Sequence, residues 1–282
     1  MSFVSQEAWA EQEAWAGRRR MIDVDGLGMA YVDIAGSEPA LLLVHGFTDT
    51  SRSFSLLAPH LVGRRLIIPD LRGHGASQAG TGCSPPDFAD DIAGLIEELR
   101  LELPVLIGHS LGAVIAIEMA ARRKPLIGGL VLLAGTLKPE IPDDHPMVAG
   151  VQALSDPISP TDPFYAYWHA CRPDVPKPFL EGMAEGASAI PAARWQSILD
   201  QLRRADLSET ARTVREKTLV IGGACDPLFG EAHQRALLCA LPDAVYVRAE
   251  NCGHNPHWED PAFVAKAIID AFKITDRPTT AK

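Results

Sequence analysis

The sequence lacks a hydrophobic run long enough to cross a membrane, and it lacks any excess of basic residues. No apolar stretch reaches the roughly 18 residues that a bilayer-spanning helix needs. Acidic residues outnumber basic ones by 36 to 26, and the formal net charge of −10 argues against nucleic acid as a partner. Glu7, Glu11 and Glu13 lie where a signal peptide would have its apolar core. We therefore expect no membrane and no nucleic acid among the partners.

Cysteine is also scarce, and no metal-binding spacing is present. The chain of 282 residues has five cysteines and no C-x-x-C pair, which is typical of a reducing compartment and predicts a cytoplasmic protein. Clustered histidines of the H-x-H-x-D-H type, which metal-dependent lactonases require, are absent as well. We expect neither a metal ion nor a cofactor.

What the sequence does contain is an alternation of strand and helix patterns. Residues 21–24 and 29–34 alternate around Asp25-Gly26 and predict a β-hairpin. Beyond it, continuous apolar runs predict strands buried on both faces, and helical patterns lie between them. The expected strands are 41–44, 66–69, 105–107 and 129–133, and the expected helices are 53–61, 87–99 and 113–121. This order predicts an α/β fold with a mostly parallel sheet, right-handed crossovers and helices on both faces.

The alternation stops between residues 137 and 214 and then resumes. The interruption is rich in proline, contains helical stretches at 179–187 and 193–204, and predicts a small helical cap inserted into the sheet domain. Strands are expected again at 218–221 and 244–249, and helices at 231–241 and 261–272. The resulting organisation is an N-terminal helical arm (1–20), a core (21–136 and 215–273), a cap (137–214) and a polar tail (274–282). The arm carries Trp9 and Trp15, and it could dock on the domain, contact a partner or attach only loosely.

One motif combines a strand, a sharp turn and a helix around a serine. Gly108-His109-Ser110-Leu111-Gly112 follows the apolar run at 105–107 and precedes an alanine-rich helical pattern. In this G-x-S-x-G setting the serine occupies a strained turn that leaves room only for very small residues two positions away on each side. Ser110 is therefore the expected nucleophile, although a serine that only caps the helix would look similar.

A serine nucleophile needs a base and an acid, and both are expected at the carboxyl ends of other strands. Asp226 follows the strand at 218–221, and His254 follows the strand at 244–249. The order Ser, Asp, His is the one expected after a nucleophile elbow. His257 is a rival base and Glu140 a rival acid.

The anion formed at the substrate carbonyl needs preorganised donors. We expect these to be the backbone amides of Leu111, which follows the nucleophile, and of Phe47, in the loop after strand 41–44. His45 is expected to brace that loop. Thr48, Asp49 and Thr50 in the same loop could hold its shape or contact substrate. Other candidates for substrate contact are His109 and the cap residues Tyr165, Trp168 and Trp195, whose rings could equally form the core of the cap.

With these residues in place, the chain resembles the α/β-hydrolase fold family from about residue 21 to residue 272. The resemblance rests on five motifs: His45-Gly46-Phe47, Asp70 to Ser77 (DLRGHGAS), the Ser110 elbow, Asp226-Pro227, and Gly253-His254 followed by Pro261 and Phe263. It implies a triad of Ser110, Asp226 and His254 under a helical cap, with Asp70, Arg72 and His74 in structural roles. Epoxide hydrolases and haloalkane dehalogenases of this fold use Asp as nucleophile, whereas this chain has Ser110.

The function favoured by these residues is a serine hydrolase that cleaves a small carboxylic ester or lactone through an acyl-enzyme on Ser110. The expected partner is therefore a small-molecule ester or lactone, and the protein would be a monomer or homodimer. Two alternatives use the same fold differently. One is carbon–carbon bond hydrolysis or perhydrolysis of the haloperoxidase type. The other is a ligand receptor, for which the N-terminal arm would supply a partner surface.

Overall fold

The computed structural model describes residues 14–122 and 126–274. The first 13 residues, which include Trp9 and most of the expected N-terminal helix, and the tail from residue 275 lie outside the described residues.

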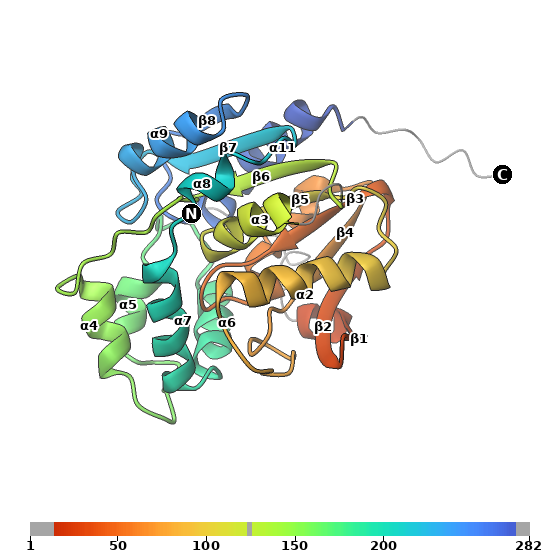
Figure 1. Cartoon of the computed structure of the whole chain (residues 1–282). Coiled ribbons are helices and arrows are strands. Elements are labelled where there is room, and N and C mark those ends of the chain that lie inside the picture. Colours follow the sequence, from red (N-terminus) through yellow and green to blue (C-terminus); the bar gives the residue numbers. More distant parts are fainter. Residues whose placement is uncertain (1–13, 123–125, 275–282) are drawn as a thin grey trace.

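A single eight-stranded sheet forms the centre of the molecule (Figure 1). Its spatial order is β1-β2-β4-β3-β5-β6-β7-β8. The strands from β4 to β8 along this order pair in parallel, whereas β2 is antiparallel to both β1 and β4. The strand bounds are β1 Arg19–Val24, β2 Leu27–Ile34, β3 Ser37–Val44, β4 Arg64–Pro69, β5 Val105–His109, β6 Gly129–Leu133, β7 Thr218–Gly223 and β8 Val245–Ala249. The predicted fold class, a mostly parallel α/β sheet, is confirmed.

The hairpin predicted at the start of the sheet is formed by β1 and β2. Val24 pairs with Leu27, which leaves Asp25 and Gly26 as a two-residue turn. Both turn residues have positive φ, at 51° and 83°, as a tight hairpin turn requires.

Alternate residues of the central strands supply two separate hydrophobic layers. In β3, Leu42 and Val44 pack into one layer, and Leu41 and Leu43 pack into the other. This period of two is the side-chain pattern of a strand covered on both faces. The first layer is closed by α2 (Pro85–Glu98), α3 (Leu111–Arg122) and α9 (Glu231–Ala240), and the second by α11 (Pro261–Phe272).

Two expected helices differ from the structure. Residues 53–61 form two separate 3₁₀ turns, η2 (Ser51–Phe54) and η3 (Ala58–Leu61), because Pro59 cannot donate to a continuing helix. The helical arm expected over residues 1–20 does not keep its α-helix to the end, since a 3₁₀ turn, η1 (Trp15–Arg18), leads directly into β1. Trp15 is only 3% exposed and donates to Ser51 Oγ, so it belongs to the core and not to a partner surface.

A group of helices lies at one end of the sheet, over the carboxyl ends of the parallel strands (Figure 1). It consists of α4 (Pro146–Ala153), α5 (Phe164–Trp168), α6 (Lys177–Ser188) and α7 (Ala192–Arg204), followed by the short α8 (Ser208–Ala211). The helical stretches at 179–187 and 193–204 are thus observed as α6 and α7. We call α4 to α7 the cap helices, while the proposed domain limits stay a prediction.

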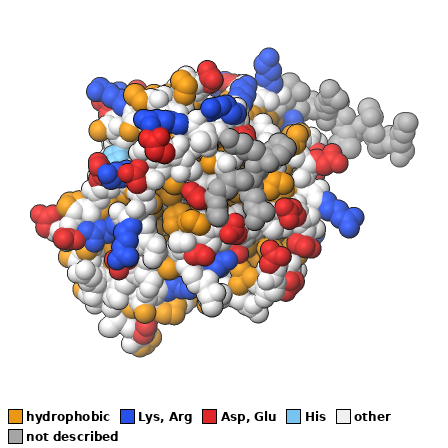
Figure 2. All heavy atoms as spheres, in the orientation of Figure 1, with side chains coloured by type: hydrophobic (Ala, Val, Ile, Leu, Met, Phe, Trp, Pro, Cys, Tyr) orange, Lys and Arg blue, Asp and Glu red, His pale blue; other side chains and the backbone are white. Residues whose placement is uncertain are grey.

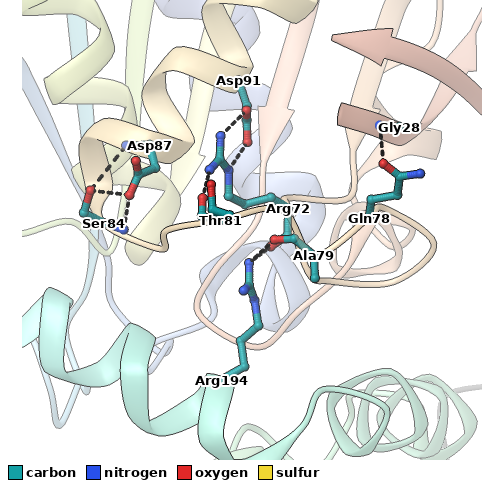
Figure 3. A network of polar contacts seen from close by, with 9 residues as sticks. All are labelled: Gly28, Arg72, Gln78, Ala79, Thr81, Ser84, Asp87, Asp91 and Arg194. Carbon is teal, nitrogen blue, oxygen red and sulfur yellow. Dashed lines mark hydrogen bonds and ion pairs between the residues drawn. The ribbon is translucent and has the colours of Figure 1, made fainter. Parts of the chain in front are cut away.

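The loop after β4 connects the core to the cap helices (Figure 3). Arg72 forms a bidentate ion pair with Asp91 of α2 at 2.5 Å. Arg194 of α7 reaches across and donates to the backbone oxygens of Arg72 (3.2 Å) and Ala79 (2.6 Å). The loop is therefore fixed from both sides, to α2 by its own arginine and to the cap by Arg194.

Charged and hydrophobic side chains are intermixed over the face of the molecule seen in Figure 2. Within the described residues, no helix is both long and apolar enough to span a bilayer.

Candidate active site

Ser110 occupies a turn in which the backbone leaves no room for larger neighbours. The turn joins β5 to α3, and Ser110 has a φ of +53°, which is strained for a residue with a side chain. A Cβ at Gly108 would lie 2.2 Å from the Gly112 oxygen, and one at Gly112 would lie 2.1 Å from the Val44 oxygen. Only glycine fits at either position, so the spacing of the motif follows directly from the packing of β3, β5 and α3.

The turn brings Ser110 into contact with a histidine and an aspartate from distant parts of the chain. His254 Nε2 lies 2.9 Å from Ser110 Oγ, and His254 Nδ1 lies 2.9 Å from Asp226 Oδ2. The second oxygen of Asp226 accepts from the amides of Leu228 (2.8 Å) and Phe229 (3.0 Å), which fixes the carboxylate. The three side chains therefore form a continuous hydrogen-bonded chain that ends at the serine hydroxyl.

The ionised form of Asp226 and the protonated form of His254 stabilise each other. Burial disfavours the protonated form of His254, but the charge and hydrogen bond of Asp226, together with the charges of Asp49 and Glu259, raise the pKa of His254 above its usual value. Burial likewise disfavours ionised Asp226, yet the imidazole and the two amides lower its pKa overall. Asp226 thus stays ionised, and His254 is a stronger base than a free histidine.

The loops that carry Asp226 and His254 are joined through their backbones. A Cβ at Gly223 would lie 2.0 Å from the Gly253 oxygen, so the two loops touch directly. The Cys225 amide donates to the Cys252 oxygen at 2.9 Å, while both thiols are free. These contacts fix the distance between the acid and the base.

The loop after β3 is held against the loop after β4 by two buried histidines. His45 Nδ1 lies 2.8 Å from the Gly46 oxygen, and its Nε2 accepts from the Leu71 amide at 2.9 Å. His74 Nε2 lies 2.7 Å from the Phe47 oxygen. Leu111 is the first residue of α3, so its amide has no carbonyl partner within the helix. His45 and His74 therefore serve as braces, which agrees with the structural roles expected for them.

A cavity of about 830 Å³, counting the part open to solvent, lies between Ser110 and the cap helices. Of the five residues expected to contact substrate, Thr48, His109 and Trp168 line it, whereas Tyr165 and Trp195 do not. Trp195 is fully buried and donates to the Ala187 oxygen, so it forms the core of the cap. Tyr165 is 7% exposed and stacks on His169 instead.

Thr48 and His109 also have clear structural contacts. Trp168 Nε1 donates to Thr48 Oγ1 at 2.7 Å, so a cap helix is bonded to the loop that carries Phe47. His109 Nε2 lies 3.0 Å from the His254 backbone oxygen, and this contact holds the backbone of the base in place. Burial and the neighbouring His254 lower the pKa of His109 to about 3, so it remains neutral.

Neither rival to the acid and base reaches Ser110. His257 is fully buried, and its Nε2 contacts Ser53 Oγ at 3.0 Å. Glu140 is exposed and lies 3.8 Å from Lys138.

The structure also shows the contacts of Asp49, which was expected either to hold the shape of the loop after β3 or to contact substrate. Asp49 lines the cavity, and its Oδ2 accepts from Ser53 Oγ at 2.9 Å, while Trp258 Nε1 donates to the same hydroxyl at 3.0 Å. No group of three or more His, Cys, Asp or Glu residues in the described part of the chain is arranged to hold a metal ion.

Known proteins share this architecture over most of its length. A 2-(acetamidomethylene)succinate hydrolase from Mesorhizobium japonicum is 30% identical over 245 residues, which is 83% of this chain and 88% of the relative. A pimeloyl-[acyl-carrier protein] methyl ester esterase from Aromatoleum aromaticum is 29% identical, with coverage of 84% and 99%. Among solved structures, a thermophilic esterase from Thermogutta terrifontis superposes with a TM-score of 0.75 at 25% identity, covering 91% of this chain and 98% of that one.

The profile of the alpha/beta hydrolase family matches residues 41–267, a range that includes the Ser110 turn, Asp226 and His254. Together with relatives that are themselves hydrolases, this match answers the question left open between an enzyme and a receptor. The chain belongs to the alpha/beta hydrolase family and is a hydrolase.

Proposed function

We propose that the protein is a serine hydrolase that cleaves a small carboxylic ester or lactone through an acyl-enzyme on Ser110. The observation that carries the proposal is the hydrogen-bonded chain from Asp226 through His254 to Ser110, with both links at 2.9 Å. This arrangement activates an otherwise weak nucleophile, because the imidazole can take the hydroxyl proton as the oxygen attacks.

Each group then has one role in acylation. Ser110 Oγ attacks the substrate carbonyl carbon while its proton passes to His254 Nε2, and the negative charge moves to the carbonyl oxygen. The amides of Phe47 and Leu111 stabilise that oxyanion. Asp226 holds the imidazole tautomer and stabilises its protonated form. Collapse of the intermediate breaks the ester C–O bond, and His254 donates the proton to the leaving alcohol.

Deacylation repeats these steps with water as the nucleophile. His254 takes a proton from the water, the hydroxide attacks the acyl carbon, and the second intermediate releases the carboxylic acid and restores Ser110. A lactone follows the same route, except that its alcohol and acid remain in one product molecule. The relatives from A. aromaticum and T. terrifontis, both esterases by name, support an oxygen ester as the scissile group.

The test compares Ser110→Ala with Ser197→Ala on p-nitrophenyl butyrate. Ser197 lies on the exposed side of α7, so its loss should leave turnover unchanged. Ser110→Ala should lower kcat by a factor of about 10³ or more while its thermal unfolding matches wild type. Fluorophosphonate labelling followed by peptide mass spectrometry should place the adduct on Ser110 alone. Retained turnover in Ser110→Ala, or an adduct elsewhere, would overturn the proposal.

A further inference from the structure

We propose that the cavity selects uncharged esters and excludes substrates that carry a carboxylate, and that Asp49 is the residue responsible for this selection. The inference rests on the proposed function, because it names the substrate class of the same site.

The walls of the cavity contain no cation to receive an anionic group. None of its lining residues is lysine or arginine, and the ionisable side chains among them are Asp49, Tyr167 and three histidines, His109, His169 and His254. Burial lowers the pKa of His169 to about 4, and that of His109 is likewise depressed, so both rings are neutral at physiological pH. Most of the remaining wall is apolar and comes from both the cap and the core: Ile141, Met147, Leu202, Pro227, Leu228, Phe229 and Trp258.

Asp49 gives this apolar wall a fixed negative charge. Its residue is 6% exposed and its carboxylate accepts from Ser53 Oγ, but no described lysine or arginine pairs with it. The nearest ionisable partner is His109 Nδ1 at 3.8 Å, and that ring is neutral. Burial raises the pKa of Asp49 to about 6, so the group is ionised above neutral pH.

The hydrogen bonds around Ser53 are consistent with an ionised Asp49. A hydroxyl has one proton to donate and two lone pairs to accept with. If Ser53 donates to Asp49, its oxygen can accept from Trp258 Nε1 and from His257 Nε2, which are both 3.0 Å away. Every polar atom at this hydroxyl is then satisfied, and Asp49, which lines the cavity, keeps its charge.

Two effects would therefore weaken the binding of an anionic substrate. Its carboxylate would leave water for an apolar wall without a counter-ion, and it would lie in the same cavity as the Asp49 carboxylate. An uncharged ester of the same length meets neither obstacle. The first effect depends on the whole wall, whereas the second depends on Asp49 alone, so a single substitution separates them.

The test uses matched pairs of esters at about pH 8, where Asp49 is ionised. Methyl butyrate, valerate and hexanoate are compared with the monomethyl esters of succinate, glutarate and adipate, which differ by a terminal carboxylate in place of a methyl group. For wild type, we expect kcat/KM to favour the uncharged member of each pair by about a hundredfold. In Asp49→Asn this ratio should fall to about tenfold, because the amide keeps an acceptor for Ser53 but removes the charge.

Glu140→Gln is the matched control, since it removes an exposed acid outside the cavity and should leave the ratio at the wild-type value. Equal or better hydrolysis of the monomethyl dicarboxylates by wild type would overturn the inference, as would an unchanged ratio in Asp49→Asn.

Binding of the same ester pairs to Ser110→Ala, measured by calorimetry, provides a readout that does not depend on turnover. Tighter binding of the uncharged esters supports the inference, and equal or tighter binding of the anions refutes it. Failure to hydrolyse any ester would count against the proposed function, while the calorimetric ratio would still decide the charge selection.

Discussion

Removing the indole N–H of Trp168 should slow catalysis without removing the aromatic wall. Trp168→Phe keeps a ring beside Phe47, whose centroid lies 5.6 Å away in a T-shaped contact, but it deletes the 2.7 Å hydrogen bond to Thr48. Thr48 is 2% exposed, so very little of its surface is open to water that could replace the lost donor. An unsatisfied buried hydroxyl costs about 1–3 kcal/mol. The affected loop carries the Phe47 amide proposed to stabilise the oxyanion.

We expect the cost to appear in kcat and to be about tenfold, since each ~1.4 kcal/mol of transition-state stabilisation corresponds to a factor of about ten. KM should change much less, because the aromatic contact surface is largely kept. Steady-state kinetics with p-nitrophenyl butyrate measures both parameters. Tyr167→Phe is the control, because Tyr167 lines the same cavity from the same helix without a hydrogen bond to Thr48.

A double-mutant cycle with Thr48→Val completes this test. In the double variant neither partner is left unsatisfied. Its kcat should therefore be about fivefold higher than the value predicted by multiplying the two single effects, which corresponds to a coupling of about 1 kcal/mol. Strictly additive effects on kcat would refute the idea that this bond positions the loop. A change confined to KM would show that Trp168 contacts substrate only.

Two further predictions concern the base and the cap. Asp226→Asn should lower kcat by about 10⁴-fold. Because Asp226 raises the pKa of His254, the acid limb of the kcat/KM profile should also move to lower pH in this variant. An acid limb at the wild-type position in a pH–rate profile would contradict this assignment. Arg194→Met removes both hydrogen bonds to the loop after β4, a loss of about 1–2 kcal/mol, and should lower Tm by about 4 °C in a thermal melt. A Tm equal to wild type would show that Arg194 does not stabilise the docked cap.

The sheet and the Ser110 turn could be predicted from sequence because local physical requirements determine them. A strand covered on both faces must be apolar throughout, and β3, β5 and β6 are therefore visible as continuous runs. The two glycines around Ser110 are required by backbone contacts shorter than 2.5 Å. Asp226 and His254 could be predicted because the loops that follow parallel strands all lie at one edge of the sheet.

The substrate cavity was less predictable because it depends on which way cap side chains face. Tyr165 and Trp168 belong to the same short helix, yet only Trp168 lines the cavity. A five-residue helix in a proline-rich insertion has too little periodicity to distinguish these two positions. The role of Asp49 was left open for another reason, since its network joins Ser53 to His257 across 204 residues and exists only after tertiary packing.

The spacing of the three reacting groups along the chain has a consequence for biosynthesis. Ser110 follows the fifth strand in chain order, whereas His254 comes 144 residues later, after the eighth. A growing chain that has exposed its serine turn carries a nucleophile with no base to activate it. By our assignment, hydrolytic competence arises only when β8 pairs with β7 at the edge of the sheet. By the same assignment, the order of synthesis leaves Ser110 of a ribosome-bound chain without its base until the last strand of the sheet has been made.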